Sequence, residues 1–187
     1  MVRADARRNQ ERILEEARGA VGAGDTGITL NELARRAGVG VGTVYRLFPT
    51  HQAMLEAVVE DGLRAMVDRA TAAAEVEDVA EGLAGFFRAS LLHAVREPGL
   101  VSVLVAVDDA VTGTSGTKVE LALAVSRLLD RGRAAGVVRS ALTGEDLLKL
   151  LCGLQHAIAA SGDDQAAVTE RYLDLVLAGL GLPGRST

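Results

Sequence analysis

The sequence is poor in residues that would indicate several common protein classes. It has a single cysteine among 187 residues, so no intrachain disulfide can form. It has no tryptophan and only 3% aromatic residues, whereas alanine, leucine and valine are abundant. Long alternating runs of β-branched residues are absent, so the composition favours packed helices over sheets. We therefore expect an all-α protein.

Signals for a membrane or a metal are also lacking. No apolar run approaches the roughly 18 residues that a spanning helix needs, so we expect no membrane partner. The first residues, MVRADARRNQER, are charged and lead into no apolar signal core, which predicts a cytoplasmic protein. His93, Cys152 and His156 are too scattered to form a metal site. We expect neither a metal nor a cofactor.

Positive charge is scarce overall but unevenly distributed. The formal net charge of −5 taken alone argues against a nucleic-acid partner. Residues 1–51 contain eight Arg and six Asp or Glu, a net +2, and the remainder contains twelve Lys or Arg and nineteen Asp or Glu, a net −7. The location of basic residues matters more than the total, so the basic end remains a candidate for contact with DNA.

Within this basic end, residues 29–38 have the pattern of a short helix with defined ends. Thr29 and Glu32 have the spacing of a capping box, in which each side chain bonds the other residue's amide. Apolar residues then recur at helical spacing, and Gly38 is suited to end the helix in a left-handed conformation.

A second short helix is predicted over residues 41–48, with Val44 and Phe48 on its buried side. Pro49 closes it, and Thr50 can cap the next helix. Two short helices joined by a tight turn form a helix-turn-helix, whose second helix can enter the DNA major groove.

The run from Gly42 to Thr50, GTVYRLFPT, closely resembles the signature of the tetracycline-repressor (TetR-type) family of transcriptional regulators. Beyond the helix-turn-helix region the resemblance rests on length and helical pattern. It implies an N-terminal three-helix DNA-binding domain (residues 1–51), a helical effector-binding and dimerisation domain (52–182) and a disordered tail (183–187). It also implies a homodimer that binds a palindromic double-stranded operator, most often as a repressor.

The candidate DNA contacts lie in and around this signature. Arg46 is predicted to read a base, with a phosphate contact as the alternative. Tyr45 and Thr43 resemble the family's phosphate-binding residues, with a surface aromatic over the core as the alternative for Tyr45. Thr50 and His51 open a helix whose free amides suit a phosphate, with a solvent-exposed bystander as the alternative for His51. The full predicted set is Arg3, Arg7, Thr29, Gly40, Val41, Gly42, Thr43, Tyr45, Arg46, Thr50 and His51.

Some positions in or near the signature leave DNA binding open to question. Gly40 stands where the family often has Ser, Leu47 where His or another polar residue is common, and His51 where Lys is common. Arg3 and Arg7 form either a basic arm or a solvated, frayed terminus. A helical interaction module that has lost DNA binding therefore remains an alternative.

Six further helices are predicted over residues 53–74, 76–96, 100–111, 118–135, 147–161 and 165–180, with a flexible loop at 112–117. Apolar residues on these helices predict a site for a small, largely apolar ligand, although each is equally consistent with a core. The candidate lining is Met66, Phe86, Phe87, Leu91, Val107 and Gln155. An enzyme that uses this pocket is a second alternative, but the sequence offers no nucleophile and base pair, so we predict a regulator and no catalytic residue.

The last two predicted helices carry more apolar positions than one buried side needs. A helix that is apolar on two sides must bury both, one of them against a partner. We therefore expect an isologous four-helix dimer interface. Its candidate residues are Leu147, Leu151, Leu154, Ile158, Val168, Tyr172, Leu175 and Gly179.

Overall fold

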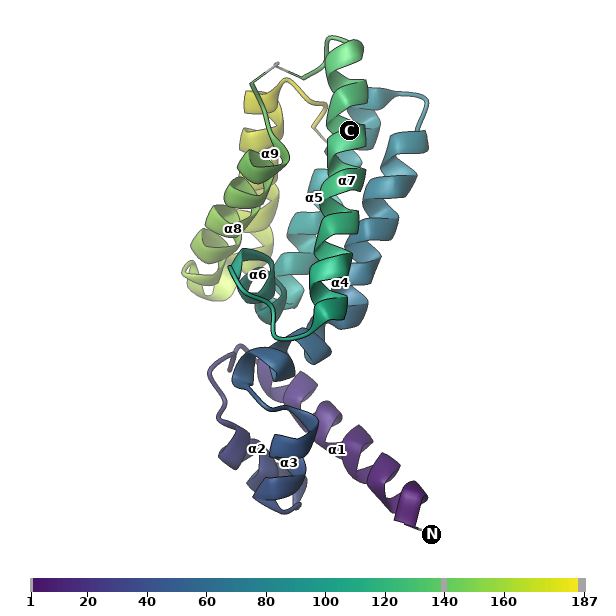
Figure 1. Cartoon of the computed structure of the whole chain (residues 1–187). Coiled ribbons are helices and arrows are strands. Elements are labelled where there is room, and N and C mark those ends of the chain that lie inside the picture. Colours follow the sequence, from purple (N-terminus) through teal and green to yellow (C-terminus); the bar gives the residue numbers. More distant parts are fainter. Residues whose placement is uncertain (1, 139–140, 185–187) are drawn as a thin grey trace. The chain divides into compact units, whose positions relative to one another are not determined.

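The computed structural model describes residues 2–138 and 141–184, which form helices joined by short connections (Figure 1). These residues contain nine α-helices, one 3-10 turn and no strand, which confirms the all-α prediction. In this part of the chain, no helix has the length and apolarity needed to cross a membrane. The helices are α1 (Val2–Gly22), α2 (Leu30–Ala37), α3 (Val41–Leu47), α4 (His51–Glu75), α5 (Val79–Arg96), α6 (Pro98–Val105), α7 (Thr112–Ala134), α8 (Gly144–Ala159) and α9 (Gln165–Leu180).

Internal packing divides the chain into two compact units. The N-terminal unit comprises Met1–Leu63 and Glu97–Gly116, and the C-terminal unit comprises Arg64–Arg96 and Thr117–Thr187. The first turns of α4 and all of α6 thus pack with α1 to α3, although the predicted boundary at residue 51 placed them in the effector domain. That boundary concerns function and stays a prediction, as does the tail, of which residues 185–187 lie outside the described part.

The N-terminal unit is built around side chains from five helices. α6 approaches α1 at Gly99, where an added Cβ would lie 2.7 Å from the Cγ1 atom of Val21. Only glycine permits this close approach without a shift of α6. The fully buried side chains at the centre of this unit are Ile13, Leu33, Val44, Met54 and Leu100.

The C-terminal unit is a helical bundle in which α5 packs against α8 and α9. Arg64 on α4 donates hydrogen bonds to Thr117 at 3.1 Å and to Glu120 at 2.5 Å, both on α7. α8 begins with a capping box, in which the side chains of Thr143 and Asp146 bond each other's amides. The central buried side chains are Leu91, Leu128, Ile158, Leu173 and Leu177.

Two predictions for the segment around residue 110 are wrong. The helix expected over residues 100–111 ends at Val105, and the loop expected at 112–117 is the first turn of α7. The amides of Ala110 and Val111 bond the Glu56 carboxylate instead of carbonyls one turn back, so this segment is not helical. Val107 is 96% exposed there, so its assignment to an enclosed ligand site is withdrawn.

Candidate nucleic-acid interface

The first helix of the helix-turn-helix begins and ends as predicted. The Glu32 amide donates to the Thr29 hydroxyl at 3.2 Å, which caps the N-terminus of α2. Gly38 has a φ of 62° and ends the helix in the left-handed region that favours glycine. Leu33 and Ala34 face the core, so the orientation of α2 is set by apolar burial.

The second half of the predicted capping box at Thr29 is wrong. The Glu32 carboxylate does not bond the Thr29 amide; it accepts hydrogen bonds from Arg35 at 2.5 Å and Arg36 at 2.9 Å. These bonds, first from Arg35 and then from Arg36, lower the pKa of Glu32 from 4.5 to about 2. Arg36 also pairs with Asp25 at 3.6 Å. The two basic side chains at the end of α2 are thus engaged by carboxylates of the same unit.

The second helix presents one buried and one exposed side. Val44 is fully buried, whereas Val41 is 45% and Tyr45 47% exposed, and Gly42 and Arg46 are exposed as well. Gly40 stands at the N-cap without a side-chain hydrogen bond, as its lack of a side chain requires. The exposed side of α3 therefore consists of the four residues predicted to face DNA, and we call it the α3 face.

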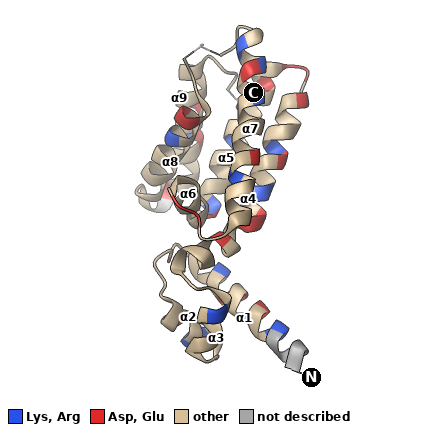
Figure 2. Ribbon diagram, in the orientation of Figure 1, with Lys and Arg blue, Asp and Glu red and all other residues tan. Residues whose placement is uncertain are grey.

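Arg46 differs from other arginines of the N-terminal unit in its partners. Among the described residues, no carboxylate lies within ion-pair distance of Arg46, and its guanidinium donates only a long 3.4 Å bond to Thr43. Figure 2 shows both acidic and basic residues along α1. Arginines of this unit that pair with carboxylates include Arg7, Arg18, Arg35 and Arg36.

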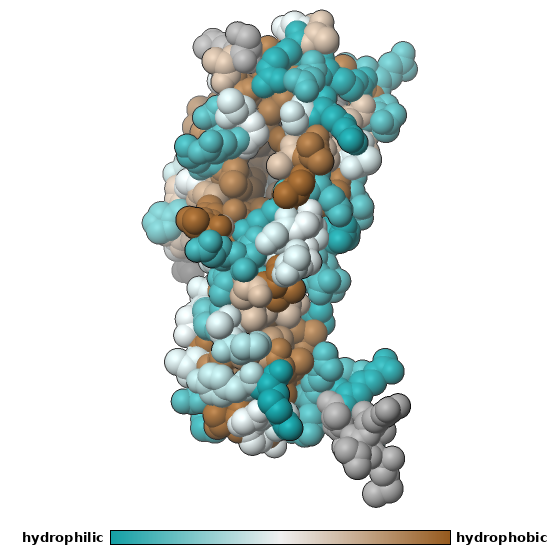
Figure 3. All heavy atoms as spheres, in the orientation of Figure 1, coloured by the Kyte–Doolittle hydropathy of each residue, from teal (hydrophilic) through white to brown (hydrophobic). Residues whose placement is uncertain are grey.

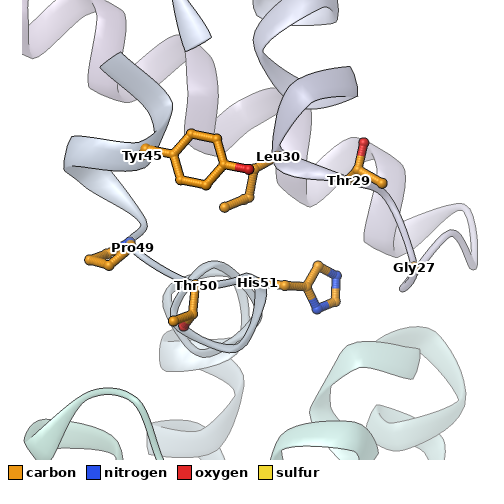
Figure 4. A pocket seen from close by; sticks show the side chains of 7 residues that line it. All are labelled: Gly27, Thr29, Leu30, Tyr45, Pro49, Thr50 and His51. Carbon is orange, nitrogen blue, oxygen red and sulfur yellow. The ribbon is translucent and has the colours of Figure 1, made fainter. Parts of the chain in front are cut away.

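A hollow of about 370 Å³ lies next to the α3 face (Figure 4). The Tyr45 ring extends over it, and its hydroxyl points toward Leu30 (Figure 4). Thr50 accepts a hydrogen bond from the Ala53 amide at 3.0 Å and so caps α4 at the edge of the hollow. The lining residues are Gly27, Thr29, Leu30, Tyr45, Pro49, Thr50 and His51.

The electrostatics of this hollow suit an anion. It contains the N-terminus of α4, a helix of 25 residues, where free amides and the helix dipole favour negative charge. The His51 Nε2 atom is buried and has no hydrogen-bond partner among the described residues. Hydroxyls from Thr29 and Tyr45 add donors at its rim. The hollow can therefore accept an oxyanion such as a phosphate group.

The two predicted basic residues at the N-terminus stand in a helix. α1 begins at Val2, and the Arg3 side chain lies outside the described part. Arg7 is exposed and pairs with Glu11 at 3.0 Å, four residues along α1. Such exposed pairs are weak, so this one leaves Arg7 able to exchange its partner for a phosphate.

The predicted ligand residues, Val107 apart, all lie in the C-terminal unit. Met66 on α4 and the α5 residues Phe86, Phe87 and Leu91 are buried, and Gln155 on α8 is half-buried. The four apolar side chains form part of the buried interior of this unit. Their role in ligand binding remains a prediction.

The predicted interface residues on α8 and α9 divide into two groups. The buried group supports the chain's own core, so it offers little surface to a partner. The other group leaves surface that a partner could contact: Leu154 and Tyr172 are half-buried, Gly179 is exposed, and Leu175 is 64% exposed. Figure 3 shows hydrophobic residues among hydrophilic ones on the face of the molecule turned to the viewer. The buried members are Leu147, Leu151, Ile158 and Val168.

Sequence reasoning missed some residues of this region. Gly27, Leu30 and Pro49 line the hollow, and their positions beside Thr29 and Thr50 were the signal that could have found them. It also missed Glu56, which is buried although charged. Periodicity places an ionisable residue on a helix but does not show that loop amides surround it.

Comparison with known proteins agrees with this geometry. The family model described as "Bacterial regulatory proteins, tetR family" matches residues 13–58, and the one described as "Transcriptional regulator SbtR-like, C-terminal domain" matches residues 78–182. A TetR regulatory protein from Mycobacterium vanbaalenii is 34% identical over 96% of this chain and 99% of its own, with a TM-score of 0.50.

This chain belongs to the TetR family of transcriptional regulators. The TetR regulator SCO0520 from Streptomyces coelicolor is 30% identical over 94% of this chain and 99% of its own, with a TM-score of 0.56. RolR, solved with its ligand resorcinol, shares the fold at 19% identity and a TM-score of 0.59, covering 97% of this chain and 91% of its own. The comparison with curated proteins gave no match.

The proteins of the TetR family share a general function. Its members are transcriptional regulators that bind DNA through the helix-turn-helix, and they are generally not enzymes. Homodimers and a response to small ligands are typical of the family. The α3 face belongs to the helix-turn-helix, the element through which this family binds DNA.

Proposed function

We propose that this TetR-family regulator binds a palindromic operator as a homodimer and represses transcription until a small, largely apolar ligand releases it. The α3 face is the observation that carries the proposal. It exposes Tyr45 and Arg46 above the buried Val44, and Arg46 has no carboxylate partner among the described residues. A guanidinium in this state can bond guanine O6 and N7 together. The place of action is then the cytoplasm, where the operator lies.

The hollow beside α3 supports a phosphate contact that orients this helix in the major groove. Contacts to phosphate set the position of a protein on DNA, whereas contacts to bases select the sequence. We assign the first role to Thr29, Thr43, Tyr45, Thr50 and His51. We assign the second role to Arg46, with Val41 and Gly42 close to the base edges.

A ligand would act by population shift. If the ligand binds better to a dimer whose α3 helices do not match the spacing of the half-sites, it lowers operator affinity by that difference in binding. The apolar interior around Met66, Phe86, Phe87 and Leu91, with Gln155 as a polar group, supports an apolar ligand.

Selection of bound duplexes from a random DNA pool tests the DNA-binding part. We expect an enriched palindrome with half-sites about one helical turn, or a multiple of it, apart. A ligand screen on the resulting complex, read by fluorescence anisotropy, then tests release. Enrichment of no sequence would contradict the proposal, and enrichment of a single half-site would contradict the dimer.

A further inference from the structure

Glu56 is a charged residue buried on α4 within the N-terminal unit, only 2% exposed. Burial of a carboxylate costs free energy unless hydrogen bonds replace its water. Here one carboxylate oxygen accepts from Gln52 Nε2 and from the Ala110 amide, and the other accepts from the Val111 amide, all at 2.8 Å. The group is therefore well satisfied, and two of its three donors belong to a distant segment.

The two backbone donors stand directly before α7, which begins at Thr112. The first amides of a helix have no partner within the helix, and a carboxylate near them is favourable. Glu56 lies 54 residues from Ala110 in sequence, yet its carboxylate binds the two amides that immediately precede this helix. It thereby ties the connection 106–111 to α4.

Apolar burial contributes little to holding this connection in place. Val105, Val107 and Val111 are among the most exposed large hydrophobic residues of the chain. The Ser115 hydroxyl bonds Asp109 at 2.9 Å, but this bond is local to the segment and its helix. The bonds of Glu56 to Ala110 and Val111 therefore join this connection to α4.

α4 in turn shares its packing with the DNA-binding helices. Its residues 53–56 are all buried, and the fully buried Met54 belongs to the same core as Val44 of α3. Three residues separate the last residue of α3 from the first of α4. Because protein interiors are close-packed and transmit strain, a displacement at Glu56 reaches the base of α3.

We propose that Glu56 is a positioning residue for operator binding, whose carboxylate ties the connection 106–111 and the start of α7 to α4, so that movement of this connection changes operator affinity. The inference rests on the proposed DNA binding. Glu56 itself touches no DNA; it acts through α4 and the core beneath α3.

Glu56→Gln tests the proposal because the amide keeps the size of the side chain but replaces one acceptor oxygen by an NH₂ donor. One of the two backbone amides then loses its partner. We expect hydrogen exchange at residues 110–111 to become about tenfold faster or more, and affinity for the duplex selected by the wild-type protein to fall about tenfold.

Glu120→Gln is the matched control, since Glu120 also joins α7 to α4, through an exposed pair with Arg64. It should change neither exchange at 110–111 nor affinity. Val111→Pro provides a second route if Glu56→Gln folds poorly, because it removes one donor at a residue that is 43% exposed. It should lower affinity with little change in the melting temperature.

The outcomes separate the two proposals. Variants that exchange faster at 110–111 yet bind the selected duplex like the wild type would reduce Glu56 to a helix cap and overturn its positioning role. Unchanged exchange in Glu56→Gln would overturn the tie itself. A wild-type protein that selects no duplex would count against the proposed DNA binding first, and the positioning role would fall with it.

Discussion

α3 and α9 each bury one side and expose the other, but their exposed sides differ in chemistry. Each helix buries one side in its own unit, Val44 in α3 and Leu173 with Leu177 in α9. The exposed side of α3 presents Tyr45 and Arg46, which suit an anionic, hydrated partner. The exposed side of α9 presents Leu175 with Tyr172 and Gly179 close by in sequence, which suits an apolar partner.

This difference shows where function is encoded in a helical chain. The buried residues of both helices serve packing alone, because other apolar side chains of suitable volume would also hold each helix in place. In the proposed function, the exposed residues decide whether a helix contacts DNA or a second copy of the chain. The predictions below alter one outer side at a time.

Leu175→Glu should have the largest effect. In the proposed dimer this side chain is buried against the partner, and an unpaired charge there is strongly unfavourable. We expect monomers by sedimentation equilibrium and loss of operator binding in a gel shift, although the DNA-binding helices are untouched. Leu123→Glu is the control, since Leu123 on α7 is similarly exposed. A wild-type protein that sediments as a monomer at micromolar concentration would contradict the interface.

Arg46→Ala should have the next largest effect, with a loss of about 1–3 kcal/mol per contact and a relaxed base preference at one position in each half-site. The measurement is affinity for duplexes that vary one position at a time. Arg35→Ala is the control, because Arg35 is already paired with Glu32. Equal weakening on every duplex would make Arg46 a phosphate contact instead.

Tyr45→Phe should weaken binding to all DNA sequences alike, by roughly 1–2 kcal/mol. The change removes one hydroxyl donor to a phosphate and keeps the ring beside Leu30. Anisotropy titrations with the selected duplex and an unrelated one measure both losses. Thr71→Ala, which removes an exposed hydroxyl from α4 within the C-terminal unit, should change neither. A loss confined to the selected duplex would place the Tyr45 hydroxyl at a base.

The sequence predicted the helix-turn-helix well because local signals set its boundaries. Thr29 starts α2, Gly38 ends it at positive φ, and Val44 fixes the buried side of α3. These features depend on neighbours within a few residues, so the sequence alone is enough to predict them.

Long-range polar contacts explain what the sequence could not predict. The apolar residues of the connection 106–111 led us to predict a helix there. The amides of Ala110 and Val111 bond the Glu56 carboxylate instead of helix carbonyls, and Glu56 is too distant in sequence for periodicity to show this. The sequence also could not show which of the residues proposed for the interface on α8 and α9 are buried within the chain. Periodicity showed two apolar sides but not that Leu147, Leu151 and Val168 belong to the inner one.

Glu32 gives a smaller prediction about the α3 face and its surroundings. Glu32→Gln would remove the carboxylate that engages Arg35 and Arg36, so more positive charge would be available to phosphate. We expect affinity for an unrelated duplex to rise roughly two- to fivefold at low salt and to return to the wild-type value at high salt. Glu145→Gln, which frees Lys149 on α8, is the control and should have no effect.

The smallest expected effect is the pH dependence that Glu32 adds to stability. Hydrogen bonds from Arg35 and Arg36 lower the pKa of Glu32 from 4.5 to about 2. Because the folded pKa lies below the unfolded one, the contribution is complete above pH 4.5 and is lost as the pH falls toward 2. The exposed site keeps it small. The difference in melting temperature between wild type and Glu32→Gln, followed by circular dichroism, should therefore shrink across this window. A difference that stays constant across it would show that these arginines do not hold the Glu32 carboxylate in the folded protein.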